Sequence, residues 1–407
     1  MSLAMWGRTL GQGVVFLIVA RVLGVDGYGA YAAVLALATA MGTFAGLGAS
    51  TLMLRNVARD PAAFAGAWGD TLVVLAVTGP ILLALYGACA WAILPVGISW
   101  VAIFFIGVAE LICMPFTLAC VNAYQGHERI GRAARLVLLP ILPRIVAVVC
   151  LLIIAPRLAA ANRLGLWALL YFLASLVSAV YMSLMIREDL GRPRLPALRA
   201  TLPVMRRGAA YAVGGSALKL YADVDKIMLA RLADLAVTGA YSAGYRVVDL
   251  AVIPLHALLM AGMPRFFKMG AKGNVSMLKS GMTLLPLPLL YATASAALLF
   301  LFANWLPVLL GNQYQTAVDV LKWLCWLPLI SLPRLLTQNL LIGKDRERVV
   351  APVLVAGVAV NVLLNLWLIP LWNWKGAVVA TYAAEVGMGV LLWRVMVTSE
   401  GRKSCST

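Results

Sequence analysis

The chain has 407 residues, of which 63% are hydrophobic and only 12% are charged, and its mean hydropathy is +0.93. A soluble core cannot use that much apolar sequence, so the composition excludes a soluble protein and indicates an all-α polytopic membrane protein. The net charge of +17 does not favour a nucleic-acid partner, because the basic residues cluster in short gaps between apolar runs, as topology signals do. At a cytoplasmic surface they would face anionic lipid.

Apolar runs of about 20 residues or more, the length that a bilayer requires, follow one another along the chain. The first run resembles a signal peptide. A signal peptide would be followed by a cleavage site and a soluble domain, whereas here further apolar runs follow. We therefore predict that it is kept as a span. The twelve predicted spans are 2–23, 28–54, 70–94, 99–124, 134–154, 166–185, 209–230, 237–263, 282–310, 317–342, 349–370 and 376–397.

The basic residues of the loops orient these spans. With the N-terminus inside, the inside segments carry 22 Lys and Arg residues and the outside loops carry five. Because cytoplasmic loops are enriched in Lys and Arg, this asymmetry predicts that both termini are cytoplasmic. The six cysteines and two histidines show no spacing typical of a disulfide framework or a metal site, so we expect no metal and no cofactor.

An internal repeat predicts two halves. ARVLGVDGYGAYAA begins at Ala20, and ARLADLAVTGAYSA begins 210 residues later at Ala230. Six predicted spans separate the copies, so the repeats are parallel and imply a pseudo-two-fold axis along the membrane normal. The predicted organisation is an N-lobe (1–190), a basic cytoplasmic connector (191–208), a C-lobe (209–398) and a cytoplasmic tail (399–407), with six helices in each lobe around a central cavity.

The stretch 216–249 carries eight charged residues although apolar runs flank it. A charged side chain at membrane depth costs free energy, so each one is expected to have a partner or a function. Lys219, Asp223 and Lys226 fall within an arc of about 60° on one helical face. One interpretation is a positive stripe that faces a water-filled cavity and receives an anionic head group. The other is that these charges pair with one another and hold helices together.

Further charges fall at span depth elsewhere in the chain. Arg144 follows Pro140 and Pro143, and prolines there would break the helix, which is tolerated beside a cavity or within packed protein. The other ionisable residues within or at the edges of the predicted spans are Glu110, Asp225, Arg246, Asp249, Asp319, Lys322, Arg334 and Glu385.

Three segments carry a resemblance to a known family. The first is ARVLG and GYGAY within 20–31, with GLG at 46–48. The second is Asp225-Lys226 followed by GAYSA at 239–243, and the third is NVLLNLWLIP followed by KGAVVATYAAE within 361–385. In this order and spacing the chain resembles the polysaccharide-transporter branch of the multidrug/oligosaccharidyl-lipid/polysaccharide exporter superfamily, the O-antigen (Wzx-type) flippases.

The resemblance implies a MATE-like fold in the bacterial inner membrane and a transporter rather than an enzyme. Its expected substrate is an undecaprenyl-diphosphate-linked oligosaccharide, an O-antigen or exopolysaccharide repeat unit, which alternating access would move from the cytoplasmic to the periplasmic leaflet. The expected protein is a monomer, with H⁺ or Na⁺ as the coupling ion.

A diphosphate head group requires a cationic cavity, because moving it through hydrocarbon is prohibitive. The candidate binding residues are Lys219, Lys226, Arg246, Arg144 and Arg334. The acidic residues that are candidates for ion coupling or for salt bridges to these cations are Asp223, Asp225, Asp249 and Glu385.

Two other functions remain open at this point. A drug or organic-cation exporter of the same superfamily should have an acidic or aromatic cavity. A polysaccharide polymerase or ligase should present a sizeable periplasmic loop with catalytic groups, whereas each predicted outside loop here is at most about a dozen residues long.

Overall fold

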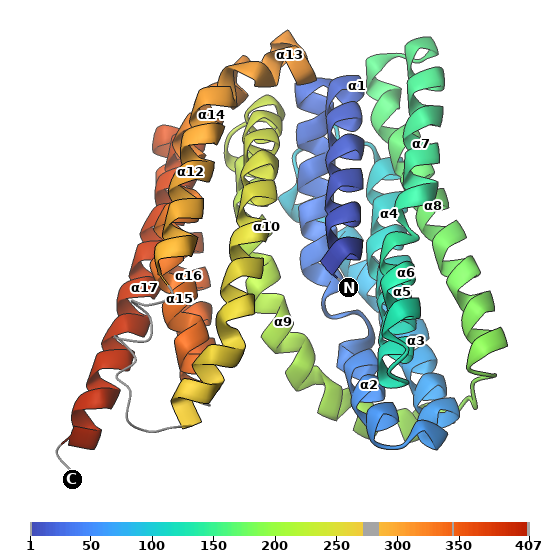
Figure 1. Cartoon of the computed structure of the whole chain (residues 1–407). Helices are drawn as coiled ribbons and strands as arrows, with labels where there is room; N and C mark the ends of the chain where they lie inside the picture. Colours follow the sequence, from blue (N-terminus) through green and yellow to red (C-terminus); the bar gives the residue numbers. More distant parts are fainter. Residues whose placement is uncertain (1, 272–284, 344–345, 405–407) are drawn as a thin grey trace. The chain divides into compact units, whose positions relative to one another are not determined.

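The computed structural model describes residues 2–271, 285–343 and 346–404, and within these ranges the regular elements are all helical (Figure 1). The predicted all-α fold is confirmed. Met282 at the start of the ninth predicted span, the end of the tail at 405–407, and Lys272, Lys279 and Lys344 of the predicted inside segments lie outside the described residues.

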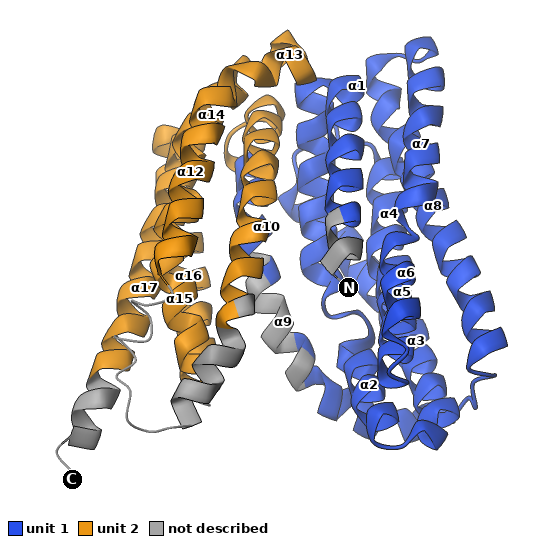
Figure 2. Cartoon of the chain, viewed as in Figure 1, with its two compact units in different colours: residues 1–231 blue, residues 232–407 orange. Residues whose placement is uncertain are grey.

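The chain forms two compact units, residues 1–231 and 232–407 (Figure 2). The lobe boundaries taken from the repeat stay a prediction. The helices of unit 1 are α1 (Ser2–Gly42), η1 (Ala45–Gly48), α2 (Ala49–Arg59), η2 (Pro61–Ala63), α3 (Phe64–Ile93), α4 (Trp100–Val108), η3 (Ala109–Cys113), α5 (Met114–Gly126), α6 (Ile130–Leu138), α7 (Ile141–Ile154), η4 (Ala155–Arg157), α8 (Ala160–Asp189) and α9 (Leu198–Leu232), whose last residue belongs to unit 2.

Helix α1 folds back on itself at Gly24. This glycine has φ 74° and ψ 174°, a conformation open in practice only to glycine. The rings of Phe16 and Tyr28 lie 5.6 Å apart, whereas twelve residues of straight helix would separate their backbones by about 18 Å. The two legs of α1 therefore lie side by side (Figure 1), as a short loop between the first two predicted spans requires.

The second predicted span, 28–54, is wrong as one uninterrupted helix. The second leg of α1 ends at Gly42, and Gly46, Leu47 and Gly48 all have positive φ before α2 begins. The Gly46 N–H donates to Thr78 Oγ1 at 2.9 Å, so the freed backbone is satisfied by α3. Hydropathy could not detect this break, because all three of its residues are small or apolar.

A single turn of π-helix, η3, interrupts the fourth predicted span, 99–124, between α4 and α5. Such turns occur mostly inside α-helices and frequently at functional sites. This one carries Glu110, and its backbone packs closely against α1, since a Cβ on Gly42 would meet the Glu110 carbonyl oxygen at 2.8 Å.

The core of unit 1 near residue 124 joins five helices. Tyr124 of α5 is buried, and its hydroxyl donates to Asp189 Oδ2 of α8 at 2.6 Å. Arg132 of α6 forms an ion pair with the same carboxylate. The buried apolar residues of this core are Met53, Val57, Phe64, Trp68, Ala119, Cys120, Val121, Ala123, Ala133, Leu136, Met182 and Ile186.

The predicted connector is an irregular segment at 190–197 followed by the first residues of α9. It packs onto α3, because the Arg194 N–H donates to the Ala65 carbonyl at 2.8 Å. Further along, Gly208 of α9 lies so close to the break after α1 that a Cβ there would come within 2.0 Å of the Leu47 carbonyl oxygen. These backbone contacts place the connector against α3 and the first part of α9 against the break after α1.

The helices of unit 2 pack around a second apolar core. Leu255, Leu332, Leu336, Leu392 and Met396 are buried in it. Helices α14 and α15 form one bent pair with an angle of 42° between them, and Pro328 lies in the first turn of the second. The helices are α10 (Leu235–Ala271), α12 (Pro286–Phe302), η5 (Ala303–Trp305), α13 (Leu306–Leu310), η6 (Asn312–Tyr314), α14 (Gln315–Leu324), α15 (Leu327–Ile342), α16 (Glu347–Trp372) and α17 (Trp374–Ser404).

By length and composition, the described residues hold nine helices able to cross a membrane, or ten if the bent pair forms one span. This makes the protein multi-pass. The number twelve stays a prediction, since it requires α1 to count as two spans and α9, which is not among these candidates, to count as one.

Candidate functional site

Unit 1 encloses a cavity of about 460 Å³, within the size range of small-molecule sites. All of its lining residues belong to unit 1. Five hydroxyl side chains and one amide lie on its wall, and charged side chains reach it from four helices. The lining residues are Arg8, Gln12, Thr39, Gly42, Thr43, Ala45, Gly48, Ser50, Thr51, Glu110, Met114, Pro115, Thr117, Leu118, Val121, Leu136, Val137, Pro140, Ile141, Arg144, Met182, Ala212 and Lys219.

The charges on this wall are unequal in sign. Arg8 of α1, Arg144 of α7 and Lys219 of α9 line the cavity, against the single carboxylate of Glu110. Arg8 and Lys219 are exposed side chains. Basic side chains on this wall therefore outnumber acidic ones by three to one.

Arg144 lies in the first turn of α7, because the chain between α6 and α7 breaks at Pro140, beside the cavity, as the sequence predicts. The arginine Nη2 donates to the Tyr171 hydroxyl of α8 at 2.9 Å, and its guanidinium lies 4.6 Å from the centre of the Tyr171 ring. Its Nε is buried and has no hydrogen-bond partner. The guanidinium thus keeps donor capacity beyond these contacts.

Tyr171 connects this arginine to an acid. Its hydroxyl donates to Glu110 Oε1, so Glu110, Tyr171 and Arg144 form a chain of hydrogen bonds from η3 through α8 to α7. Among the described residues, Glu110 and Arg144 form no direct ion pair with each other. Tyr171 is buried, and the rings of Tyr31 and Trp167 pack against its ring with centroids 6.4 and 5.8 Å away.

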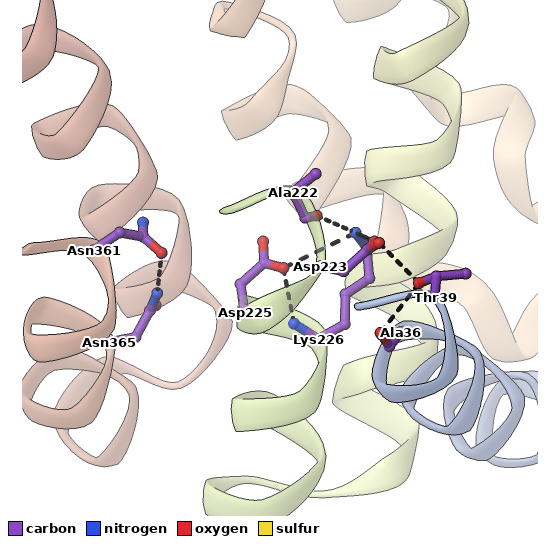
Figure 3. A network of polar contacts seen from close by, with 8 residues as sticks. All are labelled: Ala36, Thr39, Ala222, Asp223, Asp225, Lys226, Asn361 and Asn365. Carbon is purple, nitrogen blue, oxygen red and sulfur yellow. Dashed lines mark hydrogen bonds and ion pairs between the residues drawn. The ribbon is translucent and has the colours of Figure 1, made fainter. Parts of the chain in front are cut away.

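The predicted stripe on α9 divides into two parts. Lys219 lines the cavity, whereas Lys226 Nζ lies 2.9 Å from Asp223 Oδ1 and 3.9 Å from Asp225 Oδ1 (Figure 3). Asp223 also accepts a hydrogen bond from Thr39 of α1 at 3.1 Å, which joins α9 to the cavity wall. At Lys226 the charges pair, as the second interpretation expects.

The remaining candidates lie in unit 2. Arg334 Nε contacts Glu385 Oε2 at 2.6 Å, and its Nη1 donates to Gln338 at 3.0 Å. Arg246 and Asp249 are half-buried on α10. The cavity takes no lining residue from this unit, so the binding roles of these residues stay predictions.

Sequence reasoning gave Arg8, Glu110 and Tyr171 no role in the site. Glu110 had a signal, because an acidic residue in an apolar run is costly. Tyr171 had none, since a tyrosine in an apolar run is unremarkable. Among the described residues, no group of three or more His, Cys, Asp or Glu side chains could hold a metal ion.

Solved structures define the class of fold. An inward-facing multidrug resistance MATE family transporter of the MOP superfamily aligns with TM-score 0.71 and 14% identity, covering 97% of this chain and 96% of that one. The lipid II flippase MurJ in an inward closed conformation aligns with TM-score 0.71 and 11% identity, covering 96% and 86%. A MOP superfamily transporter from Pyrococcus furiosus, described as having a binding pocket of reversed polarity, aligns with TM-score 0.62 and 14% identity, covering 98% and 94%. The protein has a MATE-like fold.

Its sequence identifies the family. The profile of the polysaccharide biosynthesis protein family matches residues 3–270, well over half of the chain. The chain belongs to this family, which confirms the resemblance seen in the sequence. No curated protein matches it.

Proposed function

We propose that this protein is a flippase that moves an undecaprenyl-diphosphate-linked oligosaccharide from the cytoplasmic to the periplasmic leaflet of the bacterial inner membrane. Membership of the polysaccharide biosynthesis family supports this, and so does the fold shared with a lipid II flippase. The proposal includes cytoplasmic termini, a monomer, alternating access, and H⁺ or Na⁺ as the driving ion.

The observation that carries the proposal is the excess of basic over acidic side chains among the residues that line the cavity. A diphosphate cannot cross hydrocarbon unless polar groups replace its water. Arg8, Arg144 and Lys219 supply the positive charges for this. Arg can bind a phosphate with two parallel hydrogen bonds, and Lys acts as a compact point charge.

The rest of the wall suits a sugar. Ser50, Thr51 and Gln12 carry groups that can both donate and accept hydrogen bonds, as sugar hydroxyls do. The hydroxyls of Thr43 and Thr117 donate to backbone carbonyls and keep their oxygen as an acceptor. The volume of about 460 Å³ suits the part of a head group next to the diphosphate rather than a whole repeat unit.

A drug exporter is the competing function, because several similar solved structures are multidrug transporters. Such a protein would bind organic cations, and the three cations of this cavity would repel them. Glu110 is the one feature of the wall that favours a cation.

The test uses purified protein in vesicles that contain a fluorescent undecaprenyl-diphosphate-linked oligosaccharide. We expect the protein to make the inner-leaflet label accessible to an external quencher. In parallel, cells without the gene should accumulate the lipid-linked repeat unit on the cytoplasmic side. Export of a cationic dye without movement of the diphosphate lipid would instead assign the protein to drug export.

A further inference from the structure

One of the cations that line the cavity, Arg144, belongs to a chain of hydrogen bonds that ends at a carboxylate. Arg144 donates to Tyr171, and Tyr171 donates to Glu110. Both Arg144 and Glu110 also line the cavity, so a ligand in the cavity and the Glu110 carboxylate approach the same guanidinium. Tyr171 itself is buried and is held among aromatic rings.

A direct ion pair between Arg144 and Glu110 would have neutralised the guanidinium charge and used its N–H donors. Here the nearest partner is a neutral hydroxyl, and the buried Nε has no hydrogen-bond partner. A buried charge with unused donors is costly, and an anion in the cavity would relieve that cost. The hydrogen bond to Tyr171 therefore holds the Arg144 side chain in position, and its remaining N–H donors can still bind an anion.

A transporter must also let its ligand go. Conduction requires that binding be favourable enough to enter and weak enough to leave. Three cations with no opposing charge would hold a diphosphate too firmly. The Glu110 carboxylate supplies the opposing charge, and the π-helical turn η3 aims it at Tyr171 and the cavity.

Building on the proposed function, we propose that Glu110 is the release residue of the cavity: through Tyr171 it competes with the diphosphate for Arg144 and so keeps the affinity low enough for turnover. Arg144 has two arrangements in this scheme. With the cavity empty it is held by the Tyr171–Glu110 chain, and with a head group bound it turns its free donors to phosphate oxygens. No covalent step is involved.

The test measures affinity and transport separately. Radiolabelled undecaprenyl diphosphate is titrated against the full-length protein in nanodiscs of phosphatidylcholine, and flipping is measured in vesicles. Glu110→Gln keeps the shape and removes the charge, so it should bind the lipid on the order of tenfold more tightly and flip it more slowly. Loss of a merely structural contact would weaken binding, so tighter binding together with slower flipping excludes a merely structural role for Glu110.

A double-variant cycle shows whether Arg144 is the contested group. If Glu110 competes for Arg144, the tightening should disappear when Glu110→Gln is made in an Arg144→Gln background. Equal tightening in both backgrounds would mean that Glu110 only repels anions in general, and would overturn the proposal. Asp70→Asn is the matched control, since it removes a carboxylate of unit 1 that does not line this cavity, and it should leave affinity unchanged.

Tyr171→Phe provides a second test should Glu110→Gln fold poorly. It keeps both charges and removes only the bridging hydroxyl, so competition predicts about threefold tighter binding, whereas general repulsion predicts no change. Unchanged or weaker binding in both variants, at wild-type thermal stability, overturns the release role and leaves the flippase proposal intact. Wild-type protein that neither binds nor flips the lipid overturns the flippase proposal itself.

Discussion

Each unit contains an arginine that is associated with a glutamate, but the two arginines make different contacts. Arg144 in α7 and Arg334 in α15 each follow a proline, and each is associated with a glutamate from another helix. In unit 2 the arginine contacts Glu385 directly at 2.6 Å. In unit 1 a tyrosine stands between the arginine and Glu110.

The two arginines differ in how many of their guanidinium N–H donors already have a hydrogen-bond partner. Arg334 is 9% exposed and donates to both Glu385 and Gln338, so its charge and its fork of donors are largely used. Arg144 is half-buried at a cavity wall with an unpartnered Nε. A direct buried pair is suited to holding helices, and a bridged cation is suited to receiving a ligand.

The largest effect should come from breaking the direct pair. Glu385→Ala leaves the Arg334 charge buried without its carboxylate, which should lower the free energy of unfolding by about 3–5 kcal/mol. Thermal unfolding of the purified protein in detergent measures this. The control is Arg334→Met with Glu385→Leu, because exchanging both partners for apolar residues is often neutral. A small effect of Glu385→Ala alone would show that the pair contributes little, and the contrast with Arg144 would fail.

The second effect concerns ligand binding. Arg144→Gln removes charge-assisted hydrogen bonds of about 1.5–3 kcal/mol, so affinity for undecaprenyl diphosphate should fall about ten- to a hundredfold. The paired control, Arg334→Met with Glu385→Leu, should bind within about threefold of wild type. If the control loses as much affinity as Arg144→Gln, Arg334 belongs to the binding site, as the sequence predicts.

The sequence allowed the all-α membrane fold and the family to be predicted, because both depend on long-range composition and on motif order. It failed at the break inside the second predicted span. The turn at Gly24 falls in the predicted loop between the first two spans, whereas the turn at 46–48 was not predicted, because it depends on positive φ and hydropathy does not distinguish a glycine that packs in a helix from one that ends it.

The candidate site was only partly predictable for a related reason. A charge in an apolar run signals that it needs a partner, and this placed Arg144, Lys219 and Glu110 among the residues to explain. Which partner each finds depends on helix packing. Asp223 and Asp225 lie within three residues of Lys226 and capture it, while Tyr171, remote in sequence and without charge, reaches both Glu110 and Arg144.

The smallest effect separates the two lysines of α9. Lys219 is exposed at the cavity wall, so Lys219→Gln should weaken binding of undecaprenyl diphosphate about threefold, the scale expected for one solvated charge. The same change at Lys226 should alter affinity less than twofold, because Asp223 and Asp225 already neutralise that ammonium. Titrations at low and at physiological salt provide the check, since the Lys219 effect should shrink as salt screens an exposed charge. Equal losses at both positions would mean that Lys226 leaves its carboxylates to meet the head group, and the distinction between a paired cation and an available one would then fail within a single helix.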